Sequence, residues 1–154
     1  MSLSTHTTVM SSAEPAGPIR GGILDTNIVI HWPELGLDLL PREAAITTVT
    51  IAELSAGVHT ASTPNERGTL LELLQRVESA FEPLPFDIAA ARAYGRVVAA
   101  VRQAGRSPRG RVADQMIAAI AAANGLPIYT TNASDYVGLD DVVTVIPVPR
   151  PTRG

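Results

Sequence analysis

The chain has 154 residues, of which 45% are apolar and 18% are charged, and its formal net charge is −3. This balance is typical of one globular domain with a buried core and excludes a disordered chain. The sequence contains no cysteine and no lysine, so disulfides, zinc–thiolate sites, P-loops and Schiff-base lysines are all excluded.

Residues 1–20 are polar and show no hydrophobic periodicity, so we expect a flexible leader there. We expect one domain over residues 21–150 and a short tail over residues 151–154. The N-terminus lacks the apolar core of a secretory signal, and no apolar run approaches the about 20 residues that a membrane-spanning helix needs. These features predict a cytoplasmic protein that does not contact a membrane.

From Gly22 onwards, strand-like and helix-like segments alternate along the chain. The pattern predicts short strands at 23–24, 45–49, 81–86, 128–130 and 142–148. It predicts helices at 28–40 with an interruption at Pro33, from Ile51, from Pro64, at 88–104 after the cap Asp87, and at 112–124. Helices that separate successive strands indicate a parallel sheet covered on both faces, which is an α/β fold.

Asp114 is the only acid on the otherwise apolar helix at 112–124. The residues three, four and seven positions further on share its face and are Ile117, Ala118 and Ala121. An ionised carboxylate in such surroundings is costly unless it is paired or coordinates a cation, and no cation follows it on the helix. The alternative is that Asp114 lies near enough to the helix start to interact with the helix dipole and the free N–H groups.

Glu53 lies just after the β-branched run, and small residues surround its face. Such neighbours allow a ligand or another backbone to approach closely. The alternative is structural, because Thr50 and Glu53 match the Thr-x-x-Glu pattern of a capping box in which Thr50 is the N-cap. Both interpretations stay open on these residues alone.

Asp25 and Asp135 follow strands. Asp25 comes directly after Ile23-Leu24, and Asp135 lies in the polar segment that follows the strand at 128–130. Ligands of open α/β sheets bind at the carboxyl ends of the strands, so both acids are expected at a binding edge. The alternatives are an Asx turn or helix cap for Asp25 and an ordinary polar loop for Asp135.

The four acids thus arise at two strand ends and near two helix starts, which all point to one rim of the sheet. Carboxylates gathered there would repel one another, and a divalent cation offsets that repulsion. Ligands that are all oxygen favour Mg²⁺ or Mn²⁺. Such an ion lowers the pKa of a bound water and orients a phosphodiester, so no general-base histidine is required.

Four short segments resemble the VapC-type PIN-domain toxins in order and spacing, and they lie at residues 23–27, 51–57, 113–119 and 131–136. The resemblance implies a PIN-like three-layer α/β/α domain with a central, mainly parallel sheet. It also implies a Mg²⁺- or Mn²⁺-dependent endoribonuclease that acts as the toxin of a toxin–antitoxin pair. The implied partners are RNA, a VapB-type antitoxin and a second copy of the chain. By motif match, the catalytic and metal-binding acids are Asp25, Glu53, Asp114 and Asp135.

Between Asp87 and Asp114 the chain carries six arginines and no acid. This locally basic segment is suited to RNA phosphates despite the net negative charge, or to an acidic antitoxin tail. A solvated helix face accounts for Arg92 and Arg96, but not for the arginines of the Gly/Pro-containing loop at 105–111. The predicted substrate-binding residues are Arg106, Arg109, Arg111, Thr130 and Asn132.

Two other interpretations compete with the ribonuclease. A metal-dependent phosphatase of the haloacid-dehalogenase type also begins with an Asp after a strand. It needs a second acid two residues later, where this chain has Asn27, and it needs a lysine. A non-catalytic PIN-like interaction module would have lost some of the acids, whereas this chain retains all four. The sequence therefore favours the ribonuclease.

Overall fold

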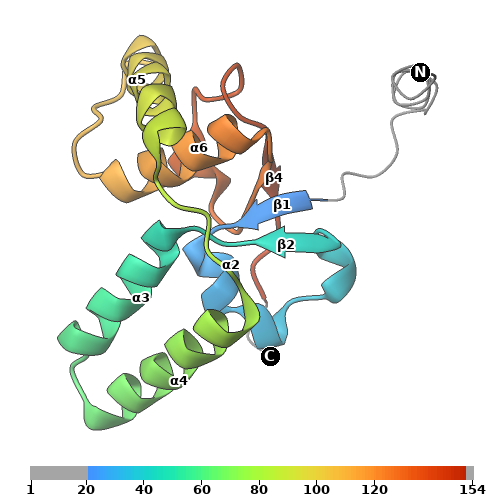
Figure 1. Ribbon diagram of the computed structural model, residues 1–154, viewed down its shortest axis with the longest axis vertical. Helices are drawn as coiled ribbons and strands as arrows, with labels where there is room; N and C mark the ends of the chain where they lie inside the picture. The colour runs from blue at the N-terminus through green and yellow to red at the C-terminus, as the bar shows by residue number, and fades with distance from the viewer. Residues whose placement is uncertain (1–20, 152–154) are drawn as a thin grey trace, which may run out of the picture.

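Figure 1 shows the protein as a computed structural model, in which residues 21–151 are described. The expected leader at 1–20 and the last three residues of the expected tail lie outside the described residues. A four-stranded sheet forms the centre, with the strand order β2-β1-β3-β4 and parallel pairing throughout. The strands are β1 (Gly21–Leu24), β2 (Glu43–Ala45), β3 (Ile128–Thr130) and β4 (Val145–Pro147). The predicted parallel sheet is confirmed.

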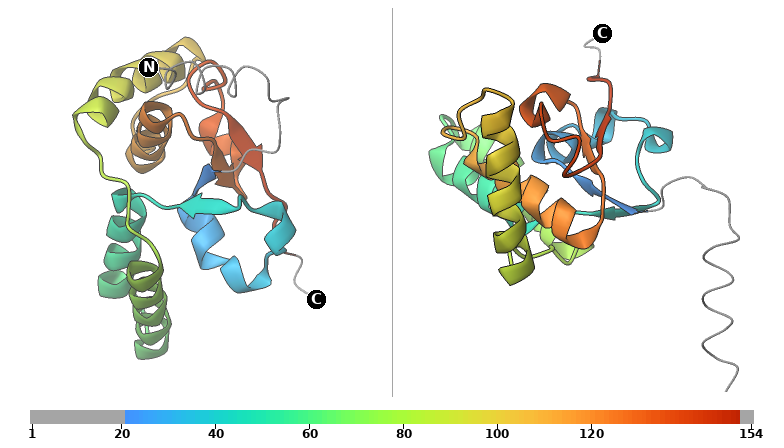
Figure 2. Two further views of the ribbon diagram at one scale, coloured as in Figure 1. Left: turned by 45° about the vertical axis from the view of Figure 1, so that its right-hand side comes forward. Right: turned by 90° about the horizontal axis from the view of Figure 1, so that it is seen from above.

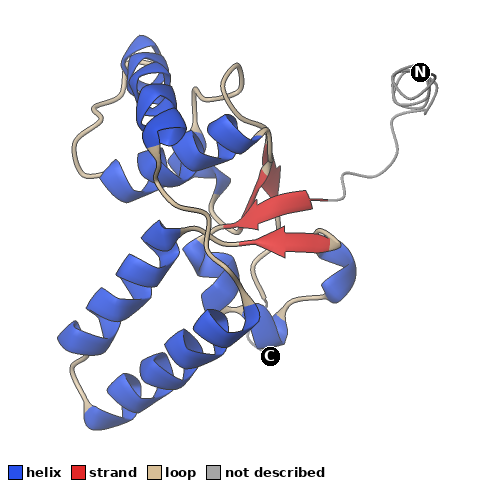
Figure 3. Cartoon of the chain, in the orientation of Figure 1, coloured by secondary structure: helices blue, strands red, loops and turns tan. Residues whose placement is uncertain are grey.

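Helices surround this sheet, as Figure 3 shows by secondary structure. The α-helices are α2 (Thr26–Ile30), α3 (Thr48–Thr60), α4 (Pro64–Ala80), α5 (Ile88–Gln103) and α6 (Val112–Asn124). Three short 3₁₀-helices are η1 (Trp32–Glu34), η2 (Leu37–Leu39) and η3 (Ala133–Tyr136). The cap of α5 is the predicted one, because the Asp87 side chain accepts a hydrogen bond from the Ala90 backbone.

The core has two parts, one on each face of the sheet. Ile23 and Ile128 belong to a cluster with residues of α5 and α6, whereas their neighbours Leu24 and Tyr129 belong to a cluster with residues of α2, α3 and α4. Successive side chains of a strand point to opposite faces, so each short strand serves both clusters. Figures 1 and 2 show the resulting arrangement, with the α3–α4 pair on one side of the sheet and α5–α6 on the other. The predicted three-layer α/β/α architecture is confirmed.

Three predicted elements differ from the structure. The strand expected at 45–49 is displaced, because β2 ends at Ala45 and helix α3 already begins at Thr48. The segment 28–40 is not one interrupted helix but α2 followed by η1 and η2. Proline lacks a backbone N–H and disfavours the helical conformation of the residue before it, which accounts for a break at Trp32-Pro33. The segment 81–86 forms only one bridge, between Thr47 and Leu84, because Pro83 and Pro85 cannot donate to a strand ladder.

The alternative interpretation of Glu53, a capping box with Thr50 as the N-cap, is wrong. Helix α3 begins one turn earlier than its pattern suggested, and its N-cap is Thr47, whose side chain accepts a hydrogen bond from the Thr50 backbone. Thr50 is therefore a buried residue within the first turn, and Glu53 lies one turn beyond the capping position. The structure thereby removes the structural explanation for Glu53.

In the described part of the chain, no helix has the combined length and apolar character needed to cross a membrane.

Candidate metal and catalytic site

The four predicted acids come from different elements that meet at the carboxyl end of the sheet. Asp25 follows β1 and caps α2, and its backbone N–H donates to the Tyr129 carbonyl of β3. Glu53 lies on α3, Asp114 lies in the first turn of α6, and Asp135 lies in η3 after β3. The charges of the other three acids all act on the pKa of Asp114, so Asp114 lies within electrostatic reach of each of them.

Asp25 is buried, with only 2% of its surface exposed. One carboxylate oxygen, Oδ1, accepts the Thr26 backbone N–H at 2.8 Å. The other, Oδ2, accepts hydrogen bonds from Thr130 Oγ1 at 2.9 Å, Tyr136 OH at 2.9 Å and Asn27 Nδ2 at 3.2 Å. Burial raises the pKa of Asp25 above its usual range, and these donors offset part of that effect.

A chain of hydroxyl groups joins Glu53 to the rest of the site. Thr26 Oγ1 donates to Glu53 Oε1 at 2.7 Å and lies 2.9 Å from Thr50 Oγ1. Because the single hydroxyl proton of Thr26 goes to Glu53, Thr50 is the donor in the second contact. Glu53 is an exposed residue, yet the protein crowded around its carboxyl still raises its pKa, with a smaller contribution from Asp25.

Asp135 is held by an amide and by a cation. Asn132 Nδ2 donates to Asp135 Oδ2 at 2.9 Å, and Arg111 Nη1 lies 3.6 Å from Asp135 Oδ1. Arg106 Nη1 also reaches this loop, where it donates to the Ser134 carbonyl at 2.9 Å. The arginine loop between α5 and α6 is thus tied to the segment that carries the fourth acid.

Asp114 is the most perturbed carboxyl group of the cluster. Within residues 21–151, its side chain makes no hydrogen bond and no ion pair. Burial, which is the largest cause, and the negative charges of Asp25, Asp135 and Glu53 together raise its pKa to about 7. The nearby Arg111 offsets only part of this rise. The dipole interpretation of Asp114 is therefore insufficient, because a stabilised helix-start carboxylate would have a lowered pKa.

The chemistry of these donors fits a hard divalent cation, since the cluster offers carboxylate oxygens whose charges repel one another. No group of three or more histidine or acidic side chains among the described residues stands in an arrangement that would hold an ion by itself. Mg²⁺ does not require such a group, because it usually retains several waters and binds through one or two carboxylates. Asp25 and Asp114 are suited to that role because both are carboxyl groups in partly dry surroundings.

The predicted substrate-binding residues divide into two groups. Arg106, Arg109 and Arg111 lie in the loop before α6 and remain at least partly exposed. Thr130 is fully buried, and its hydroxyl donates to Asp25, while the Asn132 side chain is engaged with Asp135. The positions of Thr130 and Asn132 suit the orientation of carboxylates better than contact with a substrate.

The sequence pattern did not predict four polar residues as members of this site, which are Thr26, Asn27, Thr50 and Tyr136. Asn27 bridges the two central strands, because Nδ2 donates to Asp25 and Oδ1 accepts the Thr131 backbone N–H. Thr26 and Tyr136 directly follow predicted acids, and Thr50 lies one helical turn before Glu53. That adjacency was the available signal, but it does not reveal which way a side chain points.

The amino-acid sequence is similar to a known domain family and to named ribonucleases. The PIN domain family model matches residues 23–137. Ribonuclease VapC5 of Mycobacterium tuberculosis is 38% identical over 127 residues, which cover 80% of this chain and 91% of that relative. Ribonuclease VapC4 of the same organism is 32% identical over 130 residues, which cover 82% of this chain and 97% of that relative.

Solved structures agree with the sequence relatives. A member of the VapBC family of toxin–antitoxin systems, VapBC-5 from Mycobacterium tuberculosis, superposes with a TM-score of 0.73 at 37% identity, covering 85% of this chain and 99% of that one. FitAcB from Neisseria gonorrhoeae superposes with a TM-score of 0.64 at 27% identity, covering 84% of this chain and 96% of that one. The chain therefore belongs to the PIN-domain family, and within that family it is a VapC-type toxin.

Proposed function

We propose that this protein is a Mg²⁺- or Mn²⁺-dependent endoribonuclease that acts as the toxin of a toxin–antitoxin pair. The observation that carries the proposal is Asp114, a carboxyl group without a hydrogen-bonding partner among the described residues, whose pKa is raised to about 7 by burial and by three other acids. Such a group gains a stabilising partner when a cation binds. The names of the ribonuclease relatives support RNA as the substrate.

Each residue of the site has a role in this proposal. Asp25 and Asp114 hold the ion. Asp25 is the buried acid of the cluster, and Asp114 is the acid that has no hydrogen-bonding partner among the described residues. Glu53 and Asp135 adjust its position and that of its waters from the two sides of the rim. When bound, the ion supplies an activated water and stabilises the charge that develops on the phosphodiester. Thr26 fixes Glu53 and Asp25 at once, through its hydroxyl and its backbone N–H.

RNA is proposed to reach this rim along the arginine loop. The loop precedes Asp114 directly, and its charge is uniformly positive between Asp87 and Asp114. Arg111 lies within ion-pair distance of Asp135, so a phosphate held by the loop would lie beside the acids. This local field matters more for a bound phosphate than the net charge of −3, because exposed charges farther away than about 10 Å are screened.

The second part of the proposal is a VapB-type antitoxin as partner. The solved relatives include toxin–antitoxin complexes, which supports such a partner here. A cleft of about 250 Å³ between α2, η1 and α4 offers an apolar surface, with Trp32 and Phe81 in edge-to-face contact and Arg76 among its lining residues. An apolar segment with an acidic residue fits this surface chemically. The homodimer that the family resemblance implies stays a prediction.

Replacement of either central acid tests the nuclease. We expect Asp25→Asn and Asp114→Asn to lower metal-dependent RNA cleavage by more than about 100-fold, because loss of an outer partner of a metal ligand alone costs about 10- to 100-fold. The measurement is cleavage of a fluorogenic RNA with Mg²⁺ or Mn²⁺, and again with EDTA. Circular dichroism checks that both variants are folded.

The matched control is Asp140→Asn, which changes an exposed acid near the amino ends of β3 and β4. This variant should cleave RNA as the wild type does. Wild-type activity in both Asp25→Asn and Asp114→Asn would exclude the proposed mechanism. An inactive wild-type protein that still binds an antitoxin would favour the non-catalytic interaction module.

A further inference from the structure

A buried tyrosine hydroxyl lies beneath the central carboxylate of the site. Tyr136 has only 2% of its surface exposed, and its OH donates to Asp25 Oδ2 at 2.9 Å. The residue is at the end of η3, one position after Asp135, so it approaches Asp25 from the segment that follows β3 and not from β1. A hydroxyl that is nearly inaccessible to solvent needs a hydrogen-bonding partner within the protein, and here that partner is the buried carboxylate of Asp25.

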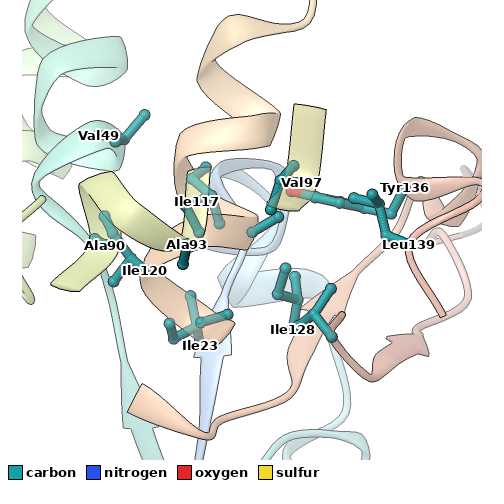
Figure 4. Packing of buried hydrophobic residues seen from close by; sticks show 14 of the residues in the cluster. Ile23, Val49, Ala90, Ala93, Val97, Ile117, Ile120, Ile128, Tyr136 and Leu139 are labelled. Atoms are coloured by element: carbon teal, nitrogen blue, oxygen red, sulfur yellow. The ribbon is translucent and has the colours of Figure 1, made fainter. Parts of the chain in front are cut away.

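The aromatic ring of Tyr136 is fixed by the core. It belongs to the hydrophobic cluster that α5 and α6 form with the sheet, and Figure 4 shows it among the residues of that cluster with Leu139 next to it. Gly138, two residues after Tyr136, packs closely on the end of α5. A Cβ atom added to Gly138 would lie 2.5 Å from the Cβ atom of Ala104. The ring therefore cannot shift without repacking, and the hydroxyl keeps one position.

The hydrogen bonds at Asp25 divide unequally between its two oxygens. Oδ2 accepts donors from three side chains, on α2, β3 and η3, whereas in the described residues Oδ1 accepts only the Thr26 backbone N–H. The three donors occupy the capacity of Oδ2, and Oδ1 retains a lone pair. A carboxylate held in this way can offer only one oxygen to a cation.

We infer that Tyr136 is a positioning residue that holds Asp25 Oδ2 from the core side, so that Asp25 presents Oδ1 alone to the cation. The inference rests on the proposed function, in which Asp25 is a metal ligand. Fixing the carboxylate before the ion arrives removes the ordering cost that a freely rotating side chain would incur on binding. Thr130 Oγ1 assists from β3, at the same distance of 2.9 Å.

The deciding variant is Tyr136→Phe, which retains the ring and removes the donor. We expect the Kd for Mn²⁺, measured without RNA from the electron paramagnetic resonance signal of the free ion, to rise about fivefold. We expect kcat for RNA cleavage to fall about 10-fold and KM to change less than about twofold, because an outer partner of a ligand acts on the ion and not on RNA binding. A merely structural role of Tyr136 would leave the Mn²⁺ affinity of the folded variant unchanged.

The control is Tyr129→Phe, the same chemical change in another buried tyrosine, whose ring packs on Gly22 in the opposite cluster. It should keep the wild-type Kd for Mn²⁺. Thr130→Val removes a second donor from Asp25 Oδ2 and should weaken Mn²⁺ binding to a similar extent. If Tyr136→Phe does not fold, this variant tests whether donors to Oδ2 position Asp25 for the cation.

An affinity for Mn²⁺ in folded Tyr136→Phe that equals or exceeds that of the wild type overturns the inference, whatever the value of kcat. The Mn²⁺ measurement needs no RNA. A wild-type protein that binds Mn²⁺ but cleaves no RNA would therefore contradict the proposed function and leave the comparison of the variants intact.

Discussion

The two central acids of the site lie in opposite surroundings. Asp25 is buried but receives four hydrogen bonds, whereas Asp114 is less buried and receives none from the described residues. Burial raises the pKa of both groups, but only Asp25 has donors that work against the rise. Asp25 is therefore arranged to stay charged in one orientation, and Asp114 is arranged to respond to the arrival of a cation or a proton.

The pH dependence of stability follows from Asp114. Its pKa rises from 3.8 in the unfolded chain to about 7 in the folded protein, so the folded state binds the proton more tightly. This contribution to stability is complete below pH 3.8 and is lost as the pH rises through about 7. Asp25 and Glu53 add to it with the same sign, because their pKa values are also raised.

We therefore expect the melting temperature of the EDTA-treated protein to fall by about 5 °C between pH 5 and pH 8. Asp114→Asn cannot lose this proton, so its melting temperature should fall much less, while Asp140→Asn should follow the wild type. Scanning calorimetry across this range provides the measurement. A wild-type melting temperature that rises with pH in this interval would contradict the assignment of the raised pKa to Asp114.

At the scale of single residues, the sequence revealed the acids but not the groups that orient them. An acid on an apolar helix is visible as an anomaly of pattern, which is why Asp114 was found. A threonine or tyrosine next to an acid is common, and only the fold decides whether it points inward, as Tyr136 does. Glu53 shows the opposite error. Its pattern suggested that Thr50 and Glu53 form a capping pair, but the helix begins one turn earlier and these residues do not cap it.

At the scale of elements, patterns with strong end signals were predicted best. Helix α6 has the predicted bounds and ends at Gly125 in a left-handed conformation with φ of 64°, as its sequence indicated. Helix α5 begins after the predicted cap. The segment 28–40 failed because its apolar residues pack irregularly around α2, η1 and η2, and a hydrophobic pattern alone does not distinguish a helix from such a connection.

The connection between α5 and α6 is held by a buried amide. Gln115 is 2% exposed, its Nε2 donates to the Pro108 carbonyl at 3.0 Å, and its Oε1 accepts the Tyr94 hydroxyl at 3.2 Å. Gln115 therefore attaches the arginine loop to both helices. Gln115 directly follows Asp114, so the residue that holds the arginine loop is the neighbour of the acid on α6.

We expect Gln115→Leu to raise KM for RNA about fivefold while kcat stays within about twofold, because a released loop holds phosphates less well but the acids remain in place. Steady-state cleavage of a short RNA measures both constants. Tyr94→Phe is the control, since it removes the α5 side of the bridge and leaves the bond to Pro108, and it should keep the wild-type KM. A fall in kcat at constant KM would show instead that the amide acts through Asp114.

At the scale of the whole molecule, charge is distributed unevenly around the sheet. The exposed side chains of Arg92, Arg96 and Arg102 lie on α5, on the face of the sheet opposite to α4, and the arginine loop follows them. The net charge of −3 thus conceals a positive surface that begins beside the acids. The four carboxylates at the end of this surface repel a negatively charged chain, and in the proposed function a bound cation would offset that repulsion.

Arg109 provides the sharpest test of this surface. Arg106 and Arg111 are engaged with Ser134 and Asp135, whereas the Arg109 guanidinium makes no hydrogen bond or ion pair with the described residues and is exposed. Its charge is therefore free for a phosphate, and removal of that charge does not disturb the loop. Arg76→Ala is the matched control, because it removes one exposed arginine from α4 on the other side of the sheet.

We expect Arg109→Ala to raise KM for RNA about fivefold and to reduce the slope of log KM against log salt concentration by about 0.7, which is the share of one phosphate contact on a single strand. Cleavage assays between about 50 and 200 mM salt measure this slope. Arg76→Ala should keep the wild-type slope, since a charge that RNA does not contact releases no counterion. If both variants keep the wild-type slope, the arginine loop does not bind RNA. The positive charge of the loop would then serve to bind the antitoxin.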